Sequence, residues 1–100
     1  MPISKDWSAI VIKGIAGNEI IVKGKANTGK LDVIPSLEKR VPQGFNPTIL
    51  QLDLLHAIDA IPENLKDVQY NEKIAEIDTY TLVEIFSEDQ IIESIEVTIE

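Results

Sequence analysis

Alternation of apolar and polar residues is the main pattern in this chain, and it predicts strands. Residues 7–13 and 19–25 are two β-rich runs, separated by the segment 14–18 with two glycines and an asparagine. In the second run Ile20 and Val22 fall on one face, with isoleucine and lysines on the other. We expect these runs to form a hairpin.

A second hairpin is expected near the C-terminus. Residues 80–86 and 91–99 are strand-like, and the polar segment 87–90 between them is typical of a turn. The return strand is expected to turn alternate apolar side chains inward: Ile95, Val97 and Ile99.

Residues 48–61 fit two descriptions. Every second residue from Leu50 to Leu54 is leucine, as in a strand, but the apolar residues up to Ile61 also fit a helical stripe. We expect a strand to about Leu55, followed by an irregular or helical turn. The alternative is a single helix near residues 47–61.

Prolines and glycines divide the remaining chain into short segments. Residues 31–34 are a strand candidate that stops before a proline, and residues 36–47, with two prolines and one glycine, are expected to be mainly a surface loop. Residues 62–70 are expected to form one helical turn and a loop, and residues 71–77 a short strand.

These elements indicate one all-β domain over residues 1–100. Ile, Val and Thr make up 29 of the 100 residues, and β-branched side chains favour strands. Six or seven short strands with frequent turns predict a two-sheet antiparallel β-sandwich. Tyr80 would stand at the start of the penultimate strand, where immunoglobulin-like sandwiches carry a tyrosine corner, so the architecture loosely resembles that class. The alternative fold is α+β with one helix near residues 47–61.

Charge is distributed unevenly along the chain, whose net charge is −8. Residues 1–50 hold seven Lys/Arg and four Asp/Glu, a net of +3, whereas residues 51–100 hold two and thirteen, a net of −11. An acidic surface repels nucleic acid and anionic membranes, so neither is expected as a partner. The expected partner is a protein or a second copy of this chain.

The chain has no cysteine, which excludes disulfides, thiolate nucleophiles and cysteine-based metal sites. No signal-peptide pattern and no apolar run of membrane-spanning length stand out, so a cytoplasmic location is expected. No cofactor is predicted.

Two motifs resemble known functional sites, a phosphate-binding loop and a histidine–aspartate group. Residues 24–30 have the glycine and lysine spacing of a phosphate-binding loop, but Leu31 follows where a Ser or Thr is needed, so a β-turn is expected. His56 lies three residues from Asp53 and from Asp59, and only a helix would put all three on one face. An ordinary surface histidine is the expected reading.

Acidic residues of the C-terminal hairpin are a candidate Ca²⁺ site, because hard cations take oxygen ligands. The four candidates are Glu84, Glu88, Asp89 and Glu93. A charged turn that solubilises the hairpin is the competing interpretation.

The proline-containing loop is the candidate interaction surface. It offers Lys39, Arg40, Gln43 and Phe45 for contacts, although a single Phe more often folds back into the core. Strand 82–86 has apolar residues on both faces, so it is expected to be central in a sheet or covered by a partner.

The expected function is therefore a small non-enzymatic binding or protein-interaction module, with self-association through opposite charges as one form of it. The alternatives are a Ca²⁺-dependent or small-ligand-binding domain and, third, a small enzyme built around His56.

Overall fold

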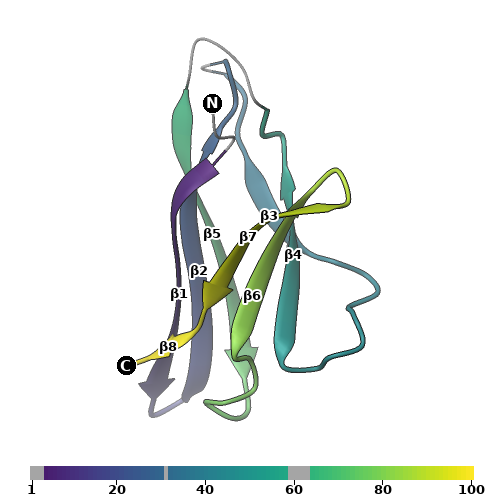
Figure 1. Ribbon diagram of the computed structural model, residues 1–100. Helices are drawn as coiled ribbons and strands as arrows, with labels where there is room; N and C mark the ends of the chain where they lie inside the picture. Colours follow the sequence, from purple (N-terminus) through teal and green to yellow (C-terminus); the bar gives the residue numbers. More distant parts are fainter. Residues whose placement is uncertain (1–3, 31, 59–63) are drawn as a thin grey trace.

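The structure is a computed structural model that describes residues 4–30, 32–58 and 64–100. These residues form no helix and eight strands: β1 (Ser4–Gly14), β2 (Gly17–Asn27), β3 (Ser36–Lys39), β4 (Ile49–Leu55), β5 (Leu65–Ile74), β6 (Leu82–Ser87), β7 (Gln90–Glu96) and β8 (Thr98–Ile99). They make two four-stranded sheets, β5-β2-β1-β8 and β3-β4-β6-β7, stacked as a β-sandwich (Figure 1). The predicted all-β two-sheet sandwich is confirmed.

Both expected hairpins are present. The β1 and β2 strands pair from Ser4 opposite Ala26 to Gly14 opposite Gly17, around a two-residue turn. Gly17 has a φ of 127°, which only glycine adopts readily. The β6 and β7 strands also pair antiparallel, around a turn at Glu88 and Asp89.

Each sheet also contains one parallel pair, so the sheets are mixed rather than antiparallel throughout. The β4 and β6 strands run parallel because β5, which connects them, lies in the other sheet. The β8 strand leaves the second sheet after β7 and joins β1 in the first, again in parallel (Figure 1). Apolar alternation determines which face of a strand is buried but not the direction of its neighbour.

The core lies between the sheets and is aliphatic. The strands of the second sheet contribute Leu50, Leu52, Val83 and Ile85, all fully buried. The first sheet contributes Val11, Ile20 and Val22, which are likewise inaccessible to solvent. Burying each of these side chains is worth about 1.5–3 kcal/mol. The β6 strand is central in its sheet, as expected: Val83 and Ile85 face the core, and Leu82 and Phe86 on the outer face are half-buried.

Trp7 closes the core beside β2. The β1–β2 register shifts between Lys5 and Ser8, and Asp6 in this bulge has a φ of 57°. The indole then lies on the backbone of Gly24, where no side chain intervenes. The Trp7 Nε1–H donates to Ser4 Oγ at 2.9 Å.

The edge strands depart most from the sequence prediction. Residues 36–39 form β3 rather than a loop, and residues 65–70 belong to β5 rather than to a helical turn. Both strands carry charged side chains toward the other sheet, which hides the alternation. Residues 32–34 are not a strand, and Leu31 lies outside the described residues.

Two further expectations need correction. The helix alternative over residues 47–61 is wrong where the structure describes it, since β4 fills that segment to Leu55, and residues 59–61 lie outside the described part. Ile99 is 45% exposed rather than inward, whereas Ile95 and Val97 pack against the core.

Candidate functional site

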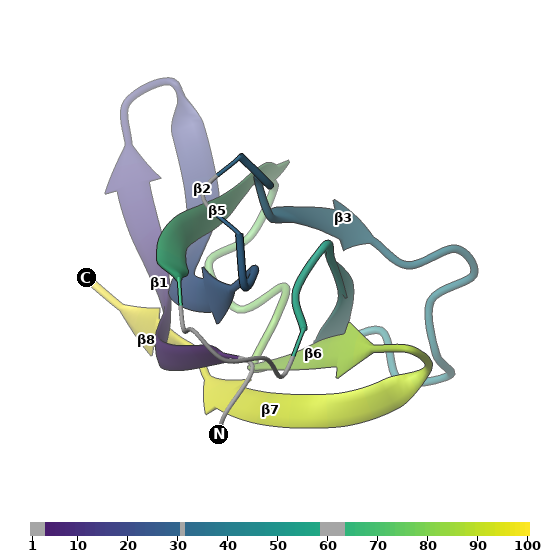
Figure 2. The same cartoon turned by 90° about the horizontal axis from the view of Figure 1, so that it is seen from above.

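The loop of residues 40–47 projects from the edge of the second sheet, between β3 and β4 (Figure 2). The Gln43 side chain anchors it. Its Nε2 donates to the carbonyl oxygens of Gln51 and Arg40 at 2.9 and 2.6 Å, and its Oε1 accepts from the Gln51 amide at 2.9 Å. The carboxamide thus pairs with β4 as a further residue of β3 would.

Two more contacts anchor the second half of the loop. The Gly44 amide donates to Gln51 Oε1 at 2.9 Å. Asn46 Oδ1 accepts from the Thr48 amide at 3.0 Å and from its hydroxyl at 2.7 Å, which is an Asx turn. Gln43 and Gly44 are thus fixed to β4, and the Asx turn fixes the end of the loop just before β4 begins.

This anchored loop holds two apolar side chains in water. Phe45 is 108% exposed and Val41 is 92% exposed. The alternative, that Phe45 folds back into the core, is wrong. Beside the ring lies an open cavity of about 350 Å³, lined by residues 43–47, Ile49 and Tyr80.

The side chain of Arg40, where the loop begins, is engaged in contacts within the protein. Its guanidinium bonds Asp53 through Nη1 at 2.9 Å and Asp89 through Nη2 at 3.2 Å. The same group lies 4.2 Å from the centroid of the Phe86 ring, a cation–π arrangement. Arg40 therefore ties the loop to β4 and to the β6–β7 turn, and its charge is balanced locally.

Lys39 belongs to a polar cluster between the sheets. Glu72 on β5 accepts the hydroxyl protons of Tyr70 and Tyr80, each at 2.7 Å. The Lys39 Nζ lies 3.1 Å from Glu72 Oε1 and donates to the Tyr80 oxygen at 3.2 Å. Tyr80 therefore bonds a carboxylate, whereas the tyrosine of an immunoglobulin corner bonds upstream backbone.

The pKa shifts in this cluster are those of a structural network. Burial alone would raise the pKa of Glu72, but the hydrogen bonds from both tyrosines and from Lys39 lower it overall. Burial, together with bonding to Glu72, raises the pKa of Tyr70 and of Tyr80. Burial alone would lower the pKa of Lys39, but its contacts to Tyr80 and Glu72 raise that pKa overall. The tyrosines therefore stay protonated at neutral pH.

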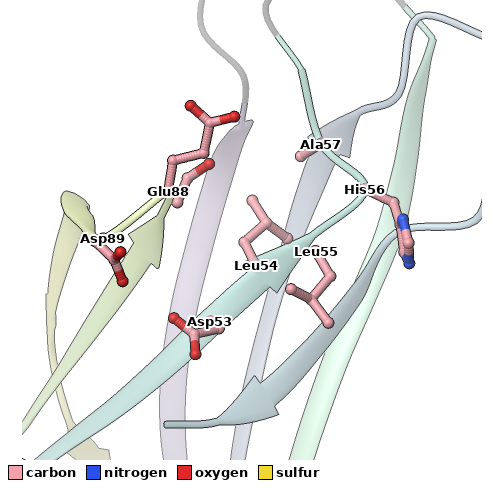
Figure 3. A pocket seen from close by; sticks show the side chains of 8 residues that line it. Asp53, Leu54, Leu55, His56, Ala57, Glu88 and Asp89 are labelled. Atoms are coloured by element: carbon pink, nitrogen blue, oxygen red, sulfur yellow. The ribbon is translucent and has the colours of Figure 1, made fainter.

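A second cavity, of about 360 Å³, is lined by residues of both the predicted histidine site and the predicted Ca²⁺ site (Figure 3). Its lining includes Asp53 and His56 at the end of β4, and Glu88 and Asp89 in the β6–β7 turn. The His56 ring points away from the three carboxylates (Figure 3). Asp59, the remaining member of the histidine hypothesis, lies outside the described residues.

The structure does not assemble the expected Ca²⁺ ligands. Asp89 is paired with Arg40, and Glu84 Oε1 accepts from Gln51 Nε2 at 2.9 Å. Within residues 4–30, 32–58 and 64–100, no three His, Cys, Asp or Glu side chains are placed to hold a metal ion. Glu93 on β7 adds no third ligand.

The segment with phosphate-loop spacing is a strand end and a turn, as expected. Gly24 lies within β2, and the Asn27 Oδ1 accepts from the Gly29 amide at 3.0 Å. Gly29 has a φ of 70°, which suits a glycine turn. No helix follows in the described residues to present its N-terminus to a phosphate.

Sequence reasoning identified the loop but missed Gln51 and the Tyr70–Glu72 pair. Spacing along the chain held no signal for Gln51, because its partners come from the 40–47 loop and from β6. Tyr70 and Glu72 share one face of β5, but Lys39 and Tyr80, which complete their cluster, are distant in sequence. In the described residues there is no helix long and apolar enough to cross a membrane. Comparison with protein families, curated proteins and solved structures found no match for this chain.

Proposed function

We propose that this chain is a non-enzymatic, cytoplasmic protein-interaction module that docks through the loop of residues 40–47. The observation that carries the proposal is the pairing of two exposed apolar side chains, Phe45 and Val41, with a backbone fixed by hydrogen bonds to β4. An aromatic anchor on an ordered loop loses little conformational entropy on binding.

The partner that fits this loop is a protein with an apolar recess for the Phe45 ring. Burying an aromatic side chain of this size removes about 150–250 Å² of surface from water. The cationic groups beside the loop are engaged internally, so the apolar anchors would supply the binding energy.

Photo-crosslinking tests the proposal. The photoreactive analogue p-benzoyl-phenylalanine replaces Phe45 in one sample and Ile15 in a matched control, since Ile15 is 110% exposed at the tip of the β1–β2 hairpin. We expect the analogue at position 45 to give a discrete crosslinked product with a partner protein, and the analogue at position 15 to give none. Excess unlabelled wild type should compete for it, and Phe45→Ser should not.

The same assay tests whether binding requires the loop to be held in place by its hydrogen bonds to β4. Gln43→Ala removes the bonds to Gln51 while leaving Phe45 in place, so we expect it to compete several-fold less well than wild type. Equal products at positions 45 and 15, or full competition by Phe45→Ser, would contradict the proposal. Thermal unfolding confirms that each variant is folded.

A further inference from the structure

The outer face of the first sheet is basic. Strand register places four exposed lysines on it, with two carboxylates between them, a net of +2. The lysines are Lys5, Lys23, Lys25 and Lys73, and the carboxylates are Glu19 and Asp67. Three isoleucines, Ile10, Ile12 and Ile21, occupy the middle of this surface, which we term the basic face.

The outer face of the second sheet is acidic. Register places Glu38, Asp53, Glu84 and Glu96 on it, one from each strand. Arg40 is the cation that bonds this surface, through Asp53, which leaves a net of −3. Exposed Ile91, opposite Phe86, adds apolar area to this acidic face.

Both faces hold like charges directly across a strand pair. Lys5 stands opposite Lys25 on the basic face, and Glu38 stands opposite Asp53 on the acidic face. Such pairs are destabilising by a few tenths of a kcal/mol, which Asp67 opposite Lys25 and Arg40 bonded to Asp53 offset only in part. A surface of opposite charge laid over either face would reduce that repulsion.

We infer that copies of this chain associate head to tail, with the basic face of one copy on the acidic face of the next. One chain supplies both complementary surfaces, and the two lie on opposite sides of the sandwich (Figure 2). A contact between two different surfaces forms a ring or an open series, and the placement of these two faces on opposite sides of the molecule favours the open series of oligomers. The net charge of −8 opposes the approach of copies at long range, but at about 0.15 M salt screening limits that repulsion to about 8 Å.

This inference uses surfaces other than the docking loop and goes beyond the proposed function. Its test is sedimentation velocity at about 0.15 M salt over concentrations up to about 1 mM. Wild type is expected to show a rising, open-ended series of species that moderate increases in salt weaken.

Charge reversal supplies the decisive comparison. A basic-face variant, Lys23→Glu with Lys25→Glu, and an acidic-face variant, Glu38→Lys with Glu96→Lys, should each associate at least about tenfold more weakly. An equimolar mixture should recover association, because the two reversed faces are again complementary. The control Lys13→Glu with Lys30→Glu reaches the same net charge of −12 away from the face and should associate more strongly than the basic-face variant.

Three results would overturn the inference. One is a single 11.1 kDa species at every concentration, and another is a mixture no more associated than its separate components. The third is loss of association in Phe45→Ser with both faces intact, which would instead place a second copy on the docking loop. Failure of the loop crosslinking with salt-sensitive association retained would count against the proposed function alone.

Discussion

The contact of Trp7 with Gly24 predicts that Gly24→Ala changes the stability of the fold, and that the sign of the change depends on whether Trp7 is present. An added Cβ at position 24 would lie 2.5 Å from Cδ2 and 2.6 Å from Cζ3 of the indole. Atoms cannot approach so closely, so Gly24→Ala must displace the ring from the inner face of the sandwich. Position 24 lies in a regular part of β2 with no positive φ angle, so alanine itself suits the backbone.

The expected magnitude follows from these two opposing effects. Overpacking of this kind costs about 1–3 kcal/mol, while replacing glycine at a compatible backbone position gains about 0.4–1 kcal/mol. At the middle of these two ranges, Gly24→Ala should destabilise wild type by about 1.3 kcal/mol. At about 4–8 °C per kcal/mol for a chain of this size, the melting temperature should fall by about 5–10 °C.

The assay is a double-mutant cycle followed by circular dichroism during urea and thermal unfolding. In the Trp7→Ala background the obstructing ring is gone, so Gly24→Ala should become neutral or stabilising. Trp7 is the single tryptophan, so its emission independently reports whether Gly24→Ala moves the indole into water. Equal destabilisation in both backgrounds, or an unshifted emission spectrum, would refute the reasoning.

Three other changes test separate parts of the structure. Because its pKa is lowered in the folded state, Glu72 stabilises the protein above its ordinary pKa of 4.5, and this stability is lost as the pH falls through the folded-state pKa. In urea titrations from about pH 6 to 2, the free energy of unfolding should therefore decline less for Glu72→Gln than for wild type, and parallel declines would count against the cluster. Asn27→Ala should cost about 2–4 kcal/mol, because the buried Asn27 Oδ1 accepts the amides of Gly29 and Asn64, and a thermal shift below 4 °C would contradict that role. Glu88→Asn should raise the melting temperature by about 2–4 °C, since Glu88 has a φ of 51° that asparagine tolerates better, and a lower value would oppose the turn geometry.

Strands with one aliphatic face and a consistent polar face were predictable from the sequence. The β4 strand illustrates this: Leu50, Leu52 and Leu54 are buried, and the residues between them are not. The hydrophobic effect acts on each side chain separately, so its pattern survives in a single strand read without its neighbours. This is why both hairpins and the two-layer class could be predicted.

The edge strands and the site depend instead on partners distant in sequence. Glu72 is tolerated on the inner side of β5 because Lys39 and Tyr80 reach it from other segments and Tyr70 bonds it from the same strand. An inward charge on an edge strand also discourages pairing with foreign strands. Likewise, the exposure of Phe45 depends on Gln43 bonding β4, a contact between a side chain and a strand backbone that periodicity does not encode.

The parallel β1–β8 pair sets an order of events during synthesis. Ile10 pairs with Thr98, so β1 can acquire this neighbour only after nearly all of the chain printed above has been made. At about 5–20 residues per second, a ribosome takes several seconds to pass from the end of β1 to β8. Throughout that interval β1 has one edge uncovered, and its protection falls to the charged Lys5 and to the bulge at Asp6, two devices that deter foreign strands from pairing. The last strand therefore acts as a closing step, and a nascent chain stalled before it would be the species most exposed to misassembly.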